Sequence, residues 1–442
     1  MTALLDTAEA AVWDRLMHAA APLRAGVVRR VFPGGFEVGG VEAALGDLVV
    51  VETSGDPVRG LVVSLGEDAI IASPLGELEG LRVGQRVTAP GGPPTVPVGA
   101  SLLGRVVDGL GRPIDDLGAM PGVVPVSLDE RPPHPLRRSR ISQPLPVGVR
   151  AIDTALTCGR GQRVGIFAGS GVGKSTLLSM IVRNTTADVI VLGLVGERGR
   201  EVREFIEDDL GAEGLARAVV VVATSDEPPL MRVCAARTAT RIAEGFRDEG
   251  KDVLLLVDSI TRYAMAQREI GLSAGEFPAT RGYPASVLSS LPRLLERAGA
   301  GEVGSVTALY TVLVEGDDMN DPIADTVRSI LDGHIVLTRT LAQRGHFPSI
   351  DVGASVSRVA TAVTDDLQQA HARRLRELLA AYEEARDLIE VGAYVSGSNP
   401  LTDEAIARRE DLLAFLQQRT HEPAAFPDAW RALAGALGEV AA

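Results

Sequence analysis

Residues 163–176 read Arg-Val-Gly-Ile-Phe-Ala-Gly-Ser-Gly-Val-Gly-Lys-Ser-Thr, an apolar run that leads into a glycine-rich loop. The apolar residues of 177–182 then recur at helical spacing, so the pattern predicts a strand, a tight loop and a helix in that order. Glycines let the N–H groups of such a loop converge on a phosphate chain at the helix N-terminus, where the helix dipole also favours anions. The stretch therefore predicts a P-loop within an α/β nucleotide-binding fold.

Individual residues of this loop have expected roles. Lys174 is expected to reach the β- and γ-phosphates of a bound nucleotide, and the Ser175 hydroxyl to ligate Mg²⁺. The usual pattern begins with glycine where this chain has Ala168, so the backbone there must accept a methyl group. ATP and Mg²⁺ are the expected ligands, and the predicted nucleotide-binding residues of the loop are Gly169, Ser170, Gly171, Val172, Gly173, Lys174, Ser175 and Thr176.

Two carboxylates are expected at the same edge of the sheet as the loop. Asp258 ends the apolar run 253–257 and so lies at the carboxyl edge, where ligands of open α/β sheets bind. It fits the acid that holds magnesium, with a helix cap as the alternative role. Glu197 follows the strand predicted at 188–195. It could polarise the water that attacks the γ-phosphate, but its position alone is equally consistent with a surface glutamate.

The pattern of apolar and turn residues divides the chain into four segments. Residues 1–23 predict an amphipathic helix, because their apolar residues recur at three- and four-residue steps. Residues 24–92 alternate short Val-rich runs with turn residues, which is typical of a small β-barrel. Residues 93–362 alternate apolar strands with helical stretches, which predicts a parallel sheet covered by helices. Residues 363–442 show only helical spacing and predict a C-terminal helical domain.

The predicted elements have these positions. The barrel runs are 26–31, 36–38, 48–52 and 60–65, and the strands of the parallel sheet are 163–167, 188–195, 218–224, 252–257, 305–314 and 334–337. One helical stripe after Thr364 is made of Leu367, Leu375, Leu378, Tyr382 and Ile389. A second stripe, which follows a predicted cap at Thr402, is made of Ile406, Leu412 and Leu416.

Composition excludes several classes of protein. The net charge of −14 argues against general affinity for nucleic acid, so no nucleic-acid partner is expected. Cys158 and Cys234 are too few for a disulfide framework or a zinc site, which favours a reducing cytosol. No signal-peptide pattern occurs, nor an apolar run of the ~20 residues that a membrane helix needs. We expect a soluble, intracellular protein.

Longer motifs accompany the P-loop. They are Gly-Glu-Arg-Gly-Arg-Glu (196–201), Asp-Ser-Ile-Thr-Arg-Tyr-Ala-Met-Ala-Gln-Arg-Glu (258–269), Pro-Ala-Thr-Arg-Gly-Tyr-Pro (278–284) and Ser-Val-Ser-Arg-Val (355–359). Together they resemble the ATPases of flagellar and virulence type III secretion, which are relatives of the catalytic subunit of rotary ATP synthases. The resemblance covers roughly residues 24–420, and the segment 387–400 is closer to the flagellar branch. It implies a β-barrel, a P-loop NTPase domain with a RecA-like parallel sheet, and a helical C-terminal domain.

The resemblance assigns roles that spacing alone does not. Glu197 matches the family's catalytic carboxylate, and Arg198 and Arg262 match arginines near the phosphates. Arg358 matches the arginine finger that a neighbouring subunit inserts. Phe347 stands where the family usually has a tyrosine against the adenine. The implied catalytic set is Lys174, Glu197, Arg198, Arg262 and Arg358, and the implied metal ligands are Ser175 and Asp258.

The resemblance also implies a function and partners. The implied protein is a magnesium-dependent, ATP-hydrolysing motor that energises flagellar-type protein export as a homohexamer. Its implied partners are a stator or regulatory protein at the N-terminal helix, the export gate proteins and substrate–chaperone complexes. Its implied location is cytoplasmic, peripheral at the cytoplasmic face of the export apparatus. A virulence type III secretion ATPase and the catalytic subunit of a rotary ATP synthase are alternatives. A ring-shaped RNA translocase would need an aromatic, basic platform near its N-terminus, and the first ninety residues carry few aromatic side chains.

Overall fold

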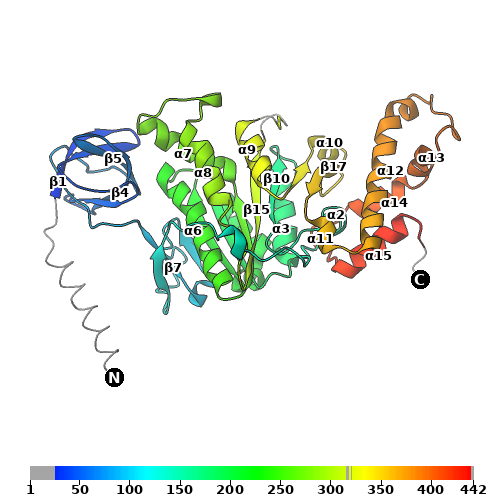
Figure 1. Cartoon of the computed structure of the whole chain (residues 1–442), viewed down its shortest axis with the longest axis horizontal. Coiled ribbons are helices and arrows are strands. Elements are labelled where there is room, and N and C mark those ends of the chain that lie inside the picture. The colour runs from blue at the N-terminus through cyan, green and yellow to red at the C-terminus, as the bar shows by residue number, and fades with distance from the viewer. Residues whose placement is uncertain (1–24, 315–317, 320, 440–442) are drawn as a thin grey trace, which may run out of the picture. The chain divides into compact units, whose positions relative to one another are not determined.

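The computed structural model describes residues 25–314, 318, 319 and 321–439, and the chain forms two compact units (Figure 1). Among these residues, one unit contains those up to Pro94 together with Ser273–Gly275, and the other contains the remainder. Within the described part of the chain, no helix combines the length and apolar character that crossing a bilayer requires. The helix predicted at 1–23 lies outside the described residues.

The first unit is a closed six-stranded barrel with strand order β1-β2-β5-β4-β3-β6. Its strands are β1 (Ala25–Phe32), β2 (Gly35–Gly39), β3 (Leu48–Val51), β4 (Val58–Leu65), β5 (Ala69–Pro74) and β6 (Arg86–Thr88). Side chains alternate along a strand, so Val49 and Val51 point into the barrel, where they pack with Phe36. The four predicted runs are confirmed as β1 to β4, whereas β5 and β6 were not predicted.

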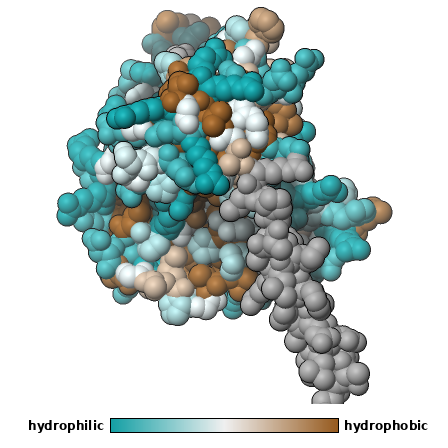
Figure 2. All heavy atoms as spheres, turned by 90° about the vertical axis from the view of Figure 1, so that its left-hand side faces the viewer, coloured by the Kyte–Doolittle hydropathy of each residue, from teal (hydrophilic) through white to brown (hydrophobic). Residues whose placement is uncertain are grey.

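The outside of the barrel carries scattered apolar side chains. Val27, Leu45 and Val83 are exposed and come from three separate segments. The near face in Figure 2 is accordingly mostly teal and white, with separate brown groups between them. Apolar residues scattered singly are normal on a protein surface.

The second unit is built on a largely parallel sheet with strand order β17-β16-β10-β15-β13-β11-β12-β8. These strands are β8 (Val106–Asp108), β10 (Arg163–Ala168), β11 (Val189–Glu197), β12 (Ala218–Thr224), β13 (Asp252–Asp258), β15 (Ser305–Leu313), β16 (Gly333–Leu337) and β17 (Ile350–Ser357), and a short β14 (Gly299–Ala300) pairs with β15. The six predicted strands are confirmed, whereas β8, β14 and β17 were not predicted. The β17 strand is antiparallel to β16, so its direction opposes that of β10.

Helices cover both faces of the sheet (Figure 1). One face carries α2 (Arg150–Ala155) and α3 (Lys174–Asn184), whose apolar residues join those of β10 to β13 in one core. The other face carries α6 (Pro229–Asp248), and Gly193 of β11 lets it approach closely. A Cβ atom on Gly193 would lie 3.0 Å from that of Ala239. The central strands are therefore buried on both faces, which explains their continuous apolar runs.

The C-terminal helices share this core. They are α11 (Ala360–Val363), α12 (Asp366–Glu390), α13 (Pro400–Ala407), α14 (Arg409–Leu416) and α15 (Phe426–Ala436). Leu375, Leu412 and Leu433 belong to the same apolar cluster as α2 and α3.

Three details of the predicted helical stripes are wrong. Leu367 and Ile406 are exposed rather than buried. The cap before α13 is Asn399, whose side chain accepts hydrogen bonds from the N–H groups of Leu401 and Thr402, while Thr402 itself is buried.

The remaining elements connect these layers. They are β7 (Thr95–Val98), β9 (Val124–Ser127), α4 (Gly199–Glu204), the π-helical η3 (Phe205–Leu210), α5 (Gly211–Ala216), α7 (Ile260–Ser273), α8 (Ala285–Leu295), α9 (Pro322–Ile330), α10 (Arg339–Gln343) and the short 3₁₀ turns η1 (Ala100–Leu102), η2 (Pro135–Arg137) and η4 (Thr280–Gly282). Both Cys158 and Cys234 are buried free thiols.

Candidate functional site

The predicted P-loop lies between β10 and α3. Gly171 and Gly173 have φ values of 76° and 89°, a left-handed conformation that glycine adopts without strain. A Cβ atom on Gly171 would meet no described atom within 4 Å, so open space lies beside the loop. Ala168 is the last residue of β10, and the extended backbone there accepts its methyl group. The loop thus keeps its form without the glycine that the usual pattern has at this position.

Three charged side chains converge at the carboxyl edge of the sheet. The Nζ atom of Lys174, at the start of α3, donates a hydrogen bond to Oδ1 of Asp258 and lies 3.5 Å from Oε1 of Glu197. Asp258 is the last residue of β13 and Glu197 the last of β11. Because these parallel strands are neighbours, their carboxyl ends bring the two acids together. The structure therefore brings together the lysine and both carboxylates that the sequence placed at this edge.

A buried threonine that sequence reasoning missed orients one of these acids. The hydroxyl of Thr311, in β15, donates a hydrogen bond to Oδ1 of Asp258 at 2.6 Å, and Thr311 is fully buried. A buried hydroxyl normally has a hydrogen-bond partner, but the sequence does not show that β15 lies beside β13. The only signal was the hydroxyl itself, in a strand that also contains Ser305, Thr307 and Tyr310.

The ionisation of the cluster follows from its burial and its charges. Burial lowers the pKa of Lys174, but the charges of Asp258 and Glu197 outweigh it and hold that pKa above its usual value. Burial and the nearby charge of Asp258 raise the pKa of Glu197 to about 7, against the attraction of Lys174. Lys174 is therefore a cation at neutral pH, while Glu197 can gain or lose a proton there.

The two arginines expected near the phosphates lie differently. Arg262, in α7, packs against Gly196, the residue before Glu197, and its Nε is buried without a hydrogen-bond partner among the described residues. An unpaired guanidinium nitrogen in this position could take an anionic ligand. Arg198 follows Glu197, but its side chain is exposed and pairs with Glu201 at 3.3 Å. The structure thus places Arg262 at the site and leaves Arg198 outside the cluster.

Phe347 lies against the P-loop. A Cβ atom on Gly173 would be 3.4 Å from two carbons of the Phe347 ring, so the ring covers the end of the loop. The residue nevertheless remains 43% exposed. An exposed aromatic face beside a phosphate loop can stack on a nucleotide base.

Arg358 lies near the amino-terminal ends of the parallel strands, opposite the ends that carry the P-loop. Its N–H donates to the carbonyl of Asp332 at 3.0 Å, and Asp332 in turn holds Arg163 at the start of β10. The P-loop follows the far end of β10, and a strand of this length spans roughly 16 Å. The Arg358 side chain is exposed and forms no ion pair with the described residues. Arg358 therefore does not join the Lys174 cluster of its own chain.

The oxygen donors of the site suit magnesium. Asp258 supplies a carboxylate and Ser175, exposed at the start of α3, supplies a hydroxyl. The described residues contain no group of three or more histidine, cysteine or acidic side chains that could cage a metal. Mg²⁺ is usually held by one or two carboxylates together with substrate phosphates, rather than by an all-protein cage. These residues fit a magnesium ion that enters with a nucleotide.

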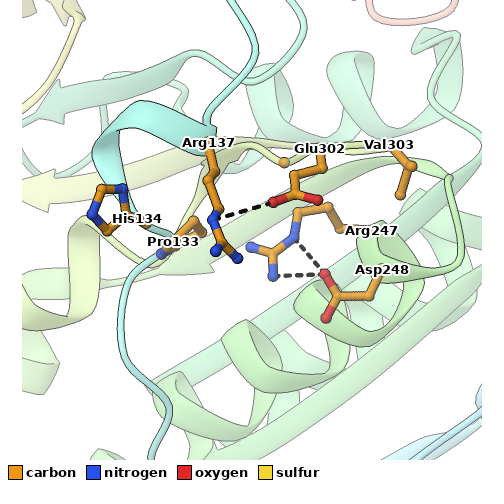
Figure 3. A pocket seen from close by; sticks show the side chains of 8 residues that line it. Pro133, His134, Arg137, Arg247, Asp248, Glu302 and Val303 are labelled. Atoms are coloured by element: carbon orange, nitrogen blue, oxygen red, sulfur yellow. Dashed lines mark hydrogen bonds and ion pairs between the residues drawn. The ribbon is translucent and has the colours of Figure 1, made fainter.

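A separate hollow of about 380 Å³ lies near the amino-terminal ends of the parallel strands (Figure 3). Its arginines are occupied by carboxylates, since Arg247 pairs with Asp248 at 2.8 Å and Arg137 lies 3.8 Å from Glu302. The hollow is close to the start of β15, whereas ligands of open α/β sheets bind at the carboxyl ends of the strands. This hollow is therefore no rival to the P-loop for the nucleotide.

Comparison with known families and proteins agrees with this geometry. Residues 148–357 match the ATP synthase alpha/beta family nucleotide-binding domain, residues 36–91 its beta-barrel domain, and residues 364–435 the T3SS EscN ATPase C-terminal domain. The chain is 52% identical to the "Flagellum-specific ATP synthase" of Bacillus subtilis over 94% of this chain and 95% of the relative. It is 51% identical to the "Type 3 secretion system ATPase" of Xanthomonas euvesicatoria over 91% of this chain and 92% of the relative.

A solved structure also resembles this chain over most of its length. The assembled ATPase EscN of the enteropathogenic Escherichia coli type III secretion system superimposes with a TM-score of 0.89 at 46% identity, covering 93% of this chain and all of EscN. The resemblance and the fold class predicted from the sequence are thereby confirmed. The chain belongs to the family of flagellar and type III secretion ATPases, enzymes whose nucleotide-binding domain is that of the ATP synthase alpha/beta family.

Proposed function

We propose that this chain is the ATP-hydrolysing motor subunit of a flagellar-type protein export apparatus and that it works as a homohexameric ring. The observation that carries the proposal is the convergence of Lys174, Asp258 and Glu197 beside an open P-loop. These are the groups that phosphoryl transfer requires: a cation for the phosphates, a carboxylate for the metal and a carboxylate for the attacking water.

Each residue has a distinct task in this mechanism. The backbone of 169–173 holds the phosphate chain, and Lys174, released from Asp258, binds the β- and γ-phosphates. The Glu197 carboxylate accepts a hydrogen bond from water and aligns it for in-line attack on the γ-phosphorus, while Arg262 stabilises the negative charge on the phosphoryl oxygens. The ring of Phe347 stacks on the adenine. Arg198 is exposed in this structure and would need to turn away from Glu201 to act on a phosphate.

Ser175 and Asp258 would hold the magnesium ion, with Thr311 fixing the Asp258 carboxylate. When bound, magnesium neutralises charge on the β- and γ-phosphate oxygens. Thr176, the last residue of the loop motif, is exposed in the first turn of α3 and completes the phosphate-binding face of that helix.

The ring is supported by the position of Arg358. This residue is exposed and far from its own P-loop, as a group that completes a neighbour's site must be. EscN has been solved as an assembled ATPase and in complex with its central stalk EscO, at TM-scores of 0.89 and 0.86 to this chain. We infer the same kind of assembly here, with a stator or regulatory protein at residues 1–23, where the sequence predicts a helix, and with export gate proteins and substrate–chaperone complexes as further partners. The ring would be cytoplasmic and peripheral to the membrane.

A deletion strain tests this function. Removal of the gene from the encoding organism should abolish motility and secretion of filament proteins, and the wild-type gene should restore both. The Lys174→Ala gene should not restore them, because loss of this phosphate ligand is expected to lower ATP turnover by about 10²–10³-fold. Lys251→Ala serves as the control, since that lysine is exposed at the opposite edge of the sheet.

The outcome of this experiment separates the alternatives. Motility with the Lys174→Ala gene at wild-type protein levels would refute the motor role of the site. Loss of virulence-protein secretion with normal motility would assign the chain to the virulence branch. Consistent copurification of a second homologous chain would favour a rotary synthase subunit.

The pH profile of the enzyme should reflect the raised pKa of Glu197. The active form is the carboxylate, so activity is lost as pH falls through a pKa of about 7. We expect kcat/KM for ATP to fall about tenfold between roughly pH 8 and pH 6. Glu197→Asp should move this limb, whereas titration of ATP itself would leave it in place. The exposed Glu207 provides the control, because Glu207→Gln should leave the profile unchanged. A flat profile in the wild type would contradict the assignment.

A further inference from the structure

A buried glutamine after α14 connects the C-terminal helices to the nucleotide site. Gln418 is 5% exposed. Its side-chain Oε1 accepts a hydrogen bond from the N–H of Arg150 at 2.8 Å, and its Nε2 donates to the carbonyls of Gly148 and Glu422, each at 2.9 Å. Both N–H groups of the amide and its oxygen are therefore hydrogen-bonded, and its orientation is fixed.

The backbone of the same residue reaches Phe347. The N–H of Gln418 donates to the carbonyl oxygen of Phe347 at 3.0 Å. The next residues are also held, because the hydroxyl of Ser349 donates to the carbonyl of Val172 in the P-loop at 2.5 Å. The segment 347–349 is thus tied to the C-terminal helices at one end and to the P-loop at the other.

This arrangement determines where the Phe347 ring lies. With its carbonyl held by Gln418, the peptide plane after Phe347 is fixed, and the side chain can leave that backbone only in a few rotamers. The ring lies beside Gly173, yet the residue as a whole remains 43% exposed, so part of it lacks packing contacts with the described residues. A displaced Gln418 would release the carbonyl and allow the ring to leave the P-loop.

Further bonds hold the Gln418 loop in place. The guanidinium of Arg150 donates to the carbonyl of Phe415 at 3.0 Å and also bonds to the carboxylate of Glu422. Asp153 in turn accepts hydrogen bonds from the N–H groups of residues 147 and 148, at 2.8 and 2.9 Å.

We propose that Gln418 is a positioning residue that holds the Phe347 ring against the P-loop and so sets affinity for the base of the nucleotide. The proposal rests on the ATP site described above and extends it to a residue outside that site. Gln418 touches no phosphate-binding residue, so its contribution passes through Phe347. It should therefore affect ligands that carry a base and spare those that consist of phosphates alone.

The test measures binding to the full-length protein of two probes, ADP and inorganic tripolyphosphate. Gln418→Met keeps the volume of the side chain and removes its amide. We expect it to weaken ADP binding about five- to tenfold, because a misplaced ring loses part of its stacking energy, and to raise the KM for ATP with little change in kcat. Affinity for tripolyphosphate should not change. The neighbouring exposed Gln417 supplies the control, and Gln417→Met should bind both probes as the wild type does.

A double-mutant cycle tests whether Gln418 acts through Phe347. Phe347→Ala should weaken ADP binding about tenfold or more, and adding Gln418→Met to it should cause little further loss, because the two residues act as one unit. Thermal unfolding and size-exclusion chromatography would check that each variant is folded and assembled. Gln418→Glu is a second variant, used if Gln418→Met proves unstable. It keeps the acceptor but sets a carboxylate oxygen against the carbonyls of Gly148 and Glu422, so it should also weaken ADP binding and spare tripolyphosphate.

Three results would overturn the inference. They are unchanged ADP binding in Gln418→Met, an equal loss of tripolyphosphate binding, and full additivity with Phe347→Ala. Each of these would leave wild-type ATP hydrolysis intact. A wild-type protein that does not hydrolyse ATP would instead overturn the proposed function.

Discussion

Arg358→Ala should reduce kcat for ATP hydrolysis by about 10³–10⁵-fold, because an arginine finger neutralises charge that develops on the transferred phosphoryl group. Arg358 is exposed, and it lies near the start of β10 while the P-loop follows the end of that strand. We therefore expect it to serve a site on another copy of the chain. Wild-type specific activity should rise with protein concentration as copies associate, and the variant should lack this rise.

Mixing two inactive variants tests action between subunits directly. Arg358→Ala retains an intact Glu197, and Glu197→Gln retains an intact Arg358. In a mixed ring, an Arg358→Ala subunit that receives Arg358 from a Glu197→Gln neighbour has a complete site. Random mixing in equal amounts should place about a quarter of the sites in this state, if each site is completed by one neighbour through a head-to-tail interface. Steady-state ATPase activity should thus recover to a measurable fraction of the wild-type rate.

The control is Arg431→Ala, which removes an exposed arginine from α15 and should retain activity. If Arg358 acted within its own subunit, the mixture would be as inactive as its components. Near-normal activity of Arg358→Ala alone would remove the finger assignment altogether. Either result would also weaken the case for a ring as the functional form.

The sequence was most informative where strands are buried on both faces. The β11 and β13 strands are continuous apolar runs because helices cover them on both sides, so their positions could be predicted. The β17 strand contains glycine and serine, and consecutive exposed residues interrupt its alternating pattern. The β8 strand has only three residues. Such edge strands carry too weak a signal to be recognised without their partners.

The site shows the same division. Lys174, Asp258 and Glu197 could be placed because each follows or ends a predicted strand, and parallel strands end at one edge. Thr311 and Gln418 act through hydrogen bonds to residues 53 and 71 positions away, and spacing in the chain does not reveal such pairs. The wrong cap at Thr402 was avoidable, since proline favours the first turn of a helix and Pro400 follows Asn399.

Glu197→Gln should bind MgATP nearly as the wild type does and hydrolyse it about 10²–10⁴-fold more slowly. The substitution preserves the size of the side chain but removes the charge that polarises water. ATP binding should therefore persist while the rate of hydrolysis falls. Pre-steady-state mixing followed by rapid filtration would show ATP retained on the protein without conversion to ADP. The matched control is Glu207→Gln, an exposed glutamate on η3 that pairs with Arg203. Wild-type turnover in Glu197→Gln would end the assignment.

Stability provides an independent check that this variant loses chemistry and not structure. The pKa of Glu197 is raised to about 7 in the fold, so the folded protein favours the protonated form more than the unfolded chain does. Its stabilising effect is present at low pH and is lost as pH rises through about 7. Above that pH the buried carboxylate opposes folding, and a neutral glutamine removes this opposition. Glu197→Gln should therefore have an equal or higher Tm than the wild type at about pH 8 without nucleotide. A large drop in Tm would mean that Glu197 holds the fold together, and the loss of turnover could then not be attributed to the missing charge.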